Sequence, residues 1–126
     1  MTTACIASDN YHVSLQNGRH EFSADEPLFK GGTDTGPDPD ELLEASLASC
    51  TAITLRMYAN RKQWPVATIT VTVAVERSPG KTIFHRNILI NGTIGDEARN
   101  RLLEIAKACP VSRILTGPSE ILNQIS

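Results

Sequence analysis

Hydrophobic positions between Pro39 and Lys62 recur with the spacing of a single long helix. The segment opens with Pro-Asp-Glu and closes with Asn-Arg-Lys, so charges of the appropriate sign lie at both ends of the helix dipole. No charged residue interrupts positions 45–55, and alanines occupy much of the side away from Cys50. One apolar arc, with Cys50 near its centre, comprises Leu42, Leu43, Ser46, Leu47, Cys50, Ile53, Thr54 and Met57.

Such a helix is apolar nearly all round, which is typical of a buried helix. At about 1.5 Å per residue it would run roughly 36 Å, against a radius of gyration of about 14 Å for a compact chain of this size. We therefore expect it to cross the whole domain or to run into a partner subunit, with Cys50 facing inward.

Strand signals occur on both sides of this helix. Asn17-Gly18 lies between two possible strands, 11–15 and 19–24, and favours a hairpin. A Gly-, Pro- and Asp-rich loop, 30–39, leads to the helix. Beyond the helix, apolar and polar residues alternate over 68–75, and Ser78-Pro-Gly-Lys81 predicts a turn into an antiparallel return strand over 83–90.

A second amphipathic helix is predicted over Asp96–Cys109, with Asp96 as its cap and Pro110 marking its end. A short 111–115 segment, a Gly117-Pro118 break and a last strand or short helix over 120–125 follow. The order hairpin, helix, hairpin, helix predicts an α+β fold, with two antiparallel β-hairpins or sheets around a long central helix. The length favours a single domain covering residues 1–126.

Composition excludes several classes of protein. A net charge of −2 offers no basic surface for nucleic acid, and the longest uncharged helical run is too short to cross a membrane. The three cysteines have no CxxC spacing, and His12, His20 and His85 share no metal-ligand spacing. We expect a soluble, cytoplasmic protein that binds neither nucleic acid nor membrane and holds no metal or cofactor.

Cys50 and Cys109 each fall on a predicted apolar helix face, and this placement has two interpretations. The simpler one is that both are small core residues. The other is a peroxide-reducing pair, in which Cys50 becomes a sulfenic acid and Cys109 condenses with it to form a disulfide. This chemistry requires a cation near the thiol, because a cysteine in the middle of a helix gains little from the helix dipole.

Two arginines are the easiest to imagine near Cys50. Arg56 points elsewhere, since it lies about 120° from Cys50 around the helix. Arg19 belongs to the first hairpin, which could fold across the helix, although a solvated strand arginine is the simpler interpretation. Asp40 and Glu41 lie about three turns before Cys50, where stabilisation of the helix N-terminus, worth about 0.3–1 kcal/mol, is their simplest role.

The run GPDPDELLEASLASCTAITLRMYANRKQWP, the strand hairpin after it and RLLEIAKACPVSRIL together resemble the OsmC/Ohr family of thiol-dependent peroxidases. The resemblance covers about residues 19–125. It implies an intertwined homodimer with long helices at its centre and active sites at the subunit interface. It also implies reduction of organic hydroperoxides to alcohols in oxidative or osmotic stress defence, with electrons from an external dithiol.

By position, the resemblance assigns Cys50 as the peroxidatic cysteine and Cys109 as the resolving cysteine. Arg19 is the nearest candidate for the arginine that stabilises the thiolate, and Asp40 or Glu41 for the acidic residue that holds this arginine. The alternative is a non-catalytic OsmC-like dimer that binds a small molecule in an apolar interface cleft. A third possibility, a thiol hydrolase or acyl carrier, would require a histidine beside Cys50.

Overall fold

The computed structural model describes residues 1–126, and the chain divides into two compact units, Met1–Leu43 and Glu44–Ser126. The prediction of a single domain over 1–126 stays a prediction. None of the helices combines the length and the apolar composition needed to span a bilayer.

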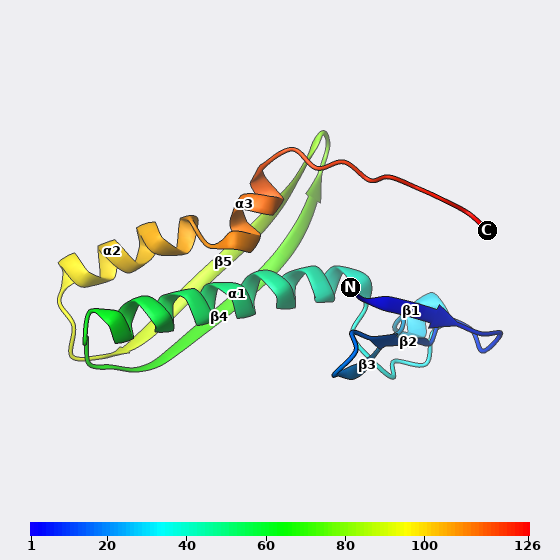
Figure 1. Cartoon of the computed structure of the whole chain (residues 1–126), viewed down its shortest axis with the longest axis horizontal. Helices are drawn as coiled ribbons and strands as arrows, with labels where there is room; N and C mark the ends of the chain where they lie inside the picture. Colours follow the sequence, from blue (N-terminus) through cyan, green and yellow to red (C-terminus); the bar gives the residue numbers. More distant parts are fainter. The chain divides into compact units, whose positions relative to one another are not determined.

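The first unit contains a three-stranded antiparallel sheet in the order β1-β2-β3 (Figure 1). Its strands are β1, Thr3–Ile6; β2, Val13–Gln16; and β3, Glu21–Ala24. The predicted hairpin at Asn17-Gly18 is confirmed as the β2–β3 connection, where the Asn17 side chain accepts a hydrogen bond from the His20 N–H at 3.1 Å. The sequence pattern did not predict strand β1, which carries Cys5.

Asp25 organises the loop that leads to the long helix. Its carboxylate accepts hydrogen bonds at 2.7 Å from the hydroxyls of both Thr33 and Thr35, and one at 2.8 Å from the Glu26 N–H. These bonds from Thr35 and Thr33 hold the pKa of Asp25 well below its ordinary value, although burial opposes them. A side chain at Gly32 would meet the Glu26 carbonyl oxygen at 1.9 Å, so only glycine fits there. The loop, which includes the short helix η1 (Leu28–Lys30), is therefore closely fixed within this unit.

Helix α1 spans Pro39–Arg61, which confirms the predicted helix to within one residue. It starts with reciprocal bonds of 2.9 Å: the Asp38 carboxylate accepts from the Glu41 N–H, and the Glu41 carboxylate accepts from the Asp38 N–H. This is a capping box in which Asp38 takes the place of serine or threonine, with Pro39 at the first helical position.

The second unit is built around a long antiparallel hairpin of β4, Val66–Ser78, and β5, Lys81–Gly92 (Figure 1). The predicted alternation in β4 is confirmed, because Ile69, Val71, Val73 and Val75 are half-buried while the residues between them are exposed. Two further helices follow, α2, Asp96–Lys107, and α3, Pro110–Thr116. The core of the unit contains Leu55, Ala59, Val66, Ile90, Leu102 and Ala106.

The buried side of α1 differs from the predicted one. The side chains that it buries follow a four-residue period through Leu47, Thr51, Leu55 and Ala59. The predicted arc centred on Cys50 is largely exposed in the single chain, with Ile53 at 59% and Met57 at 61%. The prediction that the helix is buried nearly all round is therefore wrong for one chain, because the unit covers only one stripe of the helix.

Several predictions about the C-terminal part are also wrong. Gly95, not Asp96, is the N-cap residue of α2, and Asp96 is its first helical residue. Cys109 lies beyond the end of α2 and caps α3 instead, because Pro110 starts a new helix at its first position. The predicted break at Gly117 is confirmed as the end of α3. No helix or strand forms over 120–125.

Candidate active site

Three elements of the second unit bring polar side chains to Cys109. Thr51 belongs to the buried stripe of α1, Arg86 to β5 and Ser112 to the first turn of α3. Thr51 and Cys109 are both 0% exposed, and Ser112 is 7% exposed. The site is therefore a buried polar cluster within an otherwise apolar unit.

Polar groups surround the Cys109 sulfur. Ser112 approaches it with its hydroxyl at 3.0 Å and with its backbone N–H at 3.4 Å. The Thr51 hydroxyl lies 3.7 Å from the sulfur, and a guanidinium nitrogen of Arg86 lies 4.0 Å from it. Such surroundings favour the thiolate form of a cysteine.

Burial raises the pKa of the Cys109 thiol, but the hydrogen bonds around it act in the opposite direction and prevail. The side chain and the backbone N–H of Ser112 contribute most, followed by the Thr51 hydroxyl and the thiol of Cys50. The net result is a pKa below the ordinary value for a cysteine.

Cys50 lies near enough to Cys109 to contribute to the lowered pKa of its thiol. The two thiols come from different elements, Cys50 from the middle of α1 and Cys109 from the α2–α3 junction. Cys50 is half-buried, whereas Cys109 is fully buried. The structure thus brings the two predicted cysteines together and leaves only Cys50 open to a reagent.

Arg86 is held in place by the same hydroxyls that approach the sulfur. Its guanidinium donates to the Ser112 hydroxyl at 2.8 Å and to the Thr51 hydroxyl at 3.0 Å. The Thr51 hydroxyl in turn donates to the Leu47 carbonyl at 2.7 Å. A cation, two hydroxyls and two thiols therefore form one connected network.

Sequence interpretation missed Arg86, although the strand pattern contains a signal for it. Phe84, Arg86, Ile88 and Ile90 are alternate residues of β5, and all four are at least half-buried. A charged residue in an apolar series of period two points to the core, where a charge needs polar partners. Ser112 gave no comparable signal.

The other predicted arginines and acidic residues are placed as follows. Arg19 lies in the exposed β2–β3 turn of the first unit. Glu41 takes part in the capping box, and Asp40 is half-buried in the first turn of α1. Arg56 donates to the carbonyls of Val66 and Ala67, which confirms that it points away from Cys50. The roles predicted for Arg19, Asp40 and Glu41 in activating the thiol stay predictions.

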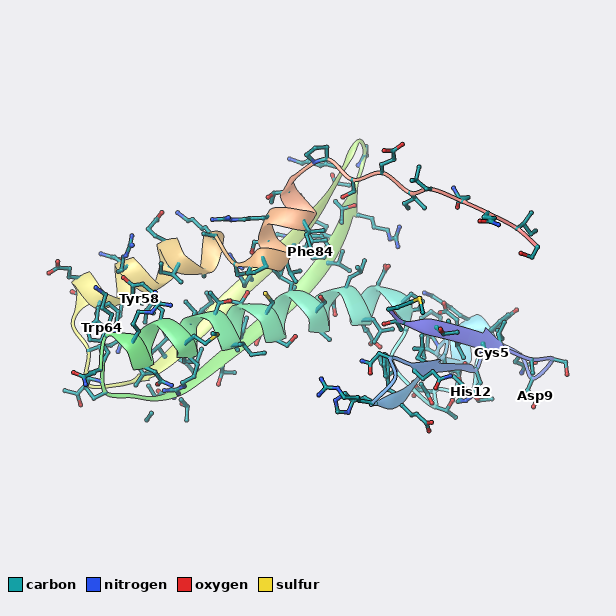
Figure 2. All side chains as sticks on the ribbon, in the orientation of Figure 1. Cys5, Asp9, His12, Tyr58, Trp64 and Phe84 are labelled. Atoms are coloured by element: carbon teal, nitrogen blue, oxygen red, sulfur yellow. The ribbon has the colours of Figure 1, made fainter.

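The remaining cysteine and the histidine of the second unit lie outside this network. Cys5 is exposed on β1 in the first unit (Figure 2). His85 faces away from its neighbour Arg86 on β5 and pairs with Glu76 at 2.6 Å. This exposed pairing gives no support to a thiol hydrolase that uses His85.

A cavity of about 690 Å³ lies beside the network, and Arg86 and Ser112 contribute to its wall. Most of the remaining wall is apolar, including Phe84, which Figure 2 labels on the hairpin. The other apolar residues that line it are Leu47, Ile83, Ile88, Leu103 and Leu115. A small organic molecule fits a cavity of this size and character.

Comparison with known proteins gave a family match. Residues 32–122 match the family described as OsmC-like protein. No curated protein matched the chain.

Several solved structures share the fold. An OsmC-like protein from Mycoplasma pneumoniae is 19% identical with a TM-score of 0.79, over 93% of this chain and 86% of that one. A Legionella pneumophila protein described as an organic hydroperoxide resistance protein, OsmC, is 23% identical with a TM-score of 0.69, over 93% and 88%. An organic hydroperoxide resistance protein from Elizabethkingia anophelis is 25% identical with a TM-score of 0.67, over 92% and 86%.

Proposed function

Since the chain belongs to the OsmC-like family, we propose that it is a thiol-dependent peroxidase that reduces organic hydroperoxides to alcohols. The observation that carries the proposal is the pairing of a half-buried Cys50 with a buried Cys109 beside the Arg86 guanidinium. Two solved structures of the same fold are described as organic hydroperoxide resistance proteins, which supports the same substrate class.

In the proposed reaction, the Cys50 thiolate attacks the distal oxygen of ROOH. The O–O bond breaks, Cys50 becomes a sulfenic acid, and the alkoxide leaves as ROH after taking a proton. Cys109 then attacks the Cys50 sulfur, so that a disulfide forms and water is released. An external dithiol restores both thiols and becomes a disulfide itself.

Exposure supports this division of roles. A hydroperoxide must reach the reacting cysteine from solvent. Cys50 is half-buried and so partly open to solvent, whereas Cys109 is 0% exposed. Cys109 in turn lies near enough to Cys50 for that thiol to lower its pKa, and a resolving thiol must be a near neighbour. All three cysteines of the chain are free thiols, which fits the reducing conditions of the cytoplasm that we propose as its location.

We also propose that the protein works as a homodimer. The face of α1 next to Cys50 carries exposed Leu43, Ile53 and Met57, which is a large apolar surface for a single chain to leave open. A second copy packed on this face would cover it and would line the approach to Cys50. We propose that, in such a dimer, Arg19 stabilises the Cys50 thiolate and Asp40 or Glu41 holds this arginine.

Peroxide consumption by single-cysteine variants tests the proposed reaction. With dithiothreitol as the dithiol, Cys50→Ser should abolish turnover of cumene hydroperoxide. Cys109→Ser should slow turnover, because dithiothreitol must then reduce the Cys50 sulfenic acid directly. Cys5→Ser is the matched control and should retain wild-type turnover. Undiminished turnover by Cys50→Ser would contradict the proposal.

A second function, a dimer that binds a small molecule without catalysis, is favoured by the apolar cavity of about 690 Å³. It predicts that an apolar ligand raises the melting temperature, because a ligand stabilises the folded state to which it binds. It also predicts that Cys50→Ser leaves the biological activity intact. Loss of that activity in Cys50→Ser would exclude it.

A further inference from the structure

The two thiols of the network differ in what their sulfur atoms meet. The Cys109 sulfur receives the Ser112 hydroxyl at 3.0 Å, the Ser112 N–H at 3.4 Å and the Arg86 guanidinium at 4.0 Å. It is also inaccessible to solvent, whereas the Cys50 sulfur belongs to a half-buried side chain. Cys50 is thus the more accessible of the two cysteines, and the surroundings of the Cys109 sulfur stabilise a negative charge on it.

Arg86 also directs the Ser112 hydroxyl. The oxygen of Ser112 accepts a hydrogen bond from Arg86 at 2.8 Å, so its own proton is free to point to another acceptor. The nearest acceptors are the Cys109 sulfur at 3.0 Å and the Ala106 carbonyl at 3.3 Å. The guanidinium therefore stabilises a Cys109 thiolate in two ways, through its own charge and through the Ser112 hydroxyl that it orients.

From this asymmetry we infer the direction of the reductive step: the external dithiol attacks the Cys50 sulfur, and Cys109 leaves as a thiolate held by Arg86 and Ser112. This inference rests on the proposed peroxidase and deepens it. One thiolate of the dithiol forms a bond with Cys50 while the Cys50–Cys109 bond breaks, and the electron pair stays on Cys109. The second thiol of the dithiol then displaces Cys50, which leaves the dithiol oxidised and both protein thiols reduced.

Two physical arguments support this direction. An attacking thiolate must approach the sulfur in line with the S–S bond, and only Cys50 is open to it. A thiol of lower pKa is also the better leaving group in thiol–disulfide exchange, and the pKa of Cys109 is lowered by its hydrogen bonds.

A trapping experiment tests the direction of attack. Diamide would be used to oxidise the protein to the Cys50–Cys109 disulfide without any hydroperoxide, and 2-mercaptoethanol, a monothiol, would then be added briefly. After acid quenching and alkylation, mass spectrometry should find the mixed disulfide on Cys50 and a free thiol at Cys109. A mixed disulfide on Cys109, or failure of diamide to join the two cysteines, would overturn the inference.

Variants of Arg86 test its role in the same step. Reduction of the diamide-made disulfide by dithiothreitol should slow at least about tenfold in Arg86→Gln, because a hydrogen bond to a charged group is lost. Arg86→Lys, which keeps a positive charge, should recover part of the rate. Arg113→Gln, which alters an exposed arginine of the same unit, should stay within about twofold of wild type. An unchanged rate in Arg86→Gln would overturn the inference.

A spectroscopic readout separates a direct effect on the sulfur from a merely structural one. In a Cys5→Ser, Cys50→Ser background, which leaves Cys109 as the one cysteine, thiolate absorbance at 240 nm reports the titration of Cys109. Arg86→Gln should shift this titration to higher pH. If Arg86→Gln does not fold, Arg86→Lys, which keeps the charge but loses the forked donors of arginine, should give a smaller shift in the same direction. No shift in a folded variant would overturn the inference. Since diamide replaces the hydroperoxide, a protein without peroxidase activity would still report on the reductive step.

Discussion

Replacement of Thr51 by valine probes the network without changing the shape of the helix. Valine keeps the branched side chain and removes only the hydroxyl, which donates to Leu47 at 2.7 Å and accepts from Arg86 at 3.0 Å. The Leu47 carbonyl retains its place in the helix, and Arg86 retains Ser112. The main loss is therefore one hydrogen bond to a charged group.

Such a bond is worth about 1.5–3 kcal/mol, and the extra apolar group buried by valine offsets part of this. We expect Thr51→Val to lower the free energy of unfolding by about 1–2 kcal/mol, measured by urea denaturation of the reduced protein. The Thr51 hydroxyl is also one of the two hydroxyls that hold Arg86 beside the Cys109 sulfur, and it contributes to the lowered pKa of Cys109, so that pKa should rise in the variant.

Thr54→Val is the matched control for this measurement. Thr54 lies on the same helix and is only half-buried, outside the network around Cys109. Its replacement should change the free energy of unfolding by no more than about 0.5 kcal/mol and should leave the titration of Cys109 where it was. Equal stability and equal Cys109 titration in Thr51→Val and Thr54→Val would refute the reasoning.

Three further predictions follow from the two units and the exposed helix face. Leu55→Ala should cost about 2–5 kcal/mol in urea unfolding, because Leu55 is 0% exposed, and a cost below about 1 kcal/mol would contradict its place in the core. Asp25→Asn should destabilise the protein at pH 6 but progressively less below pH 4. The reason is that the carboxyl of the unfolded chain, with an ordinary pKa of 3.8, takes up its proton at a higher pH than the carboxyl of the folded chain. A loss of stability that does not depend on pH would contradict this. Ile53→Glu should convert the proposed dimer to a monomer in size-exclusion chromatography with light scattering, and a variant that elutes as a dimer would exclude this face as the interface.

Elements with strong local signals could be predicted from the sequence. Pro39 and the dipole-matched charges at both ends of α1 gave its bounds to within one residue, and Asn17-Gly18 located the first hairpin. The alternation in β4 predicted which of its side chains are half-buried. The OsmC-like family match and the α+β architecture confirm the resemblance and the fold class drawn from these segments.

Features that depend on tertiary contacts were harder to predict. The apolar spacing predicted that the second helix continues to Cys109, whereas α2 ends at Lys107. The error arose because α3 starts at Pro110, and the short break between the two helices leaves the apolar spacing almost unchanged. The stripe of α1 that packs in the unit was also misjudged, since a helix apolar on several sides gives no single direction to its core.

The candidate site was predicted only in part, because it too depends on tertiary contacts. The two cysteines could be identified from the sequence, and the structure makes them neighbours. The sequence could not identify the cation beside Cys109, because Arg86 is far from it along the chain and reaches it only when the hairpin packs on α1 and α3. Its position within the alternating apolar series of β5 was the one available signal.

Disulfide mapping after peroxide treatment tests the central claim most directly. Reduced protein would be treated with excess cumene hydroperoxide, alkylated and examined by mass spectrometry. The proposed mechanism predicts a disulfide between Cys50 and Cys109, with Cys5 outside it. Intact free thiols at both Cys50 and Cys109 after excess oxidant would contradict the proposed peroxidase.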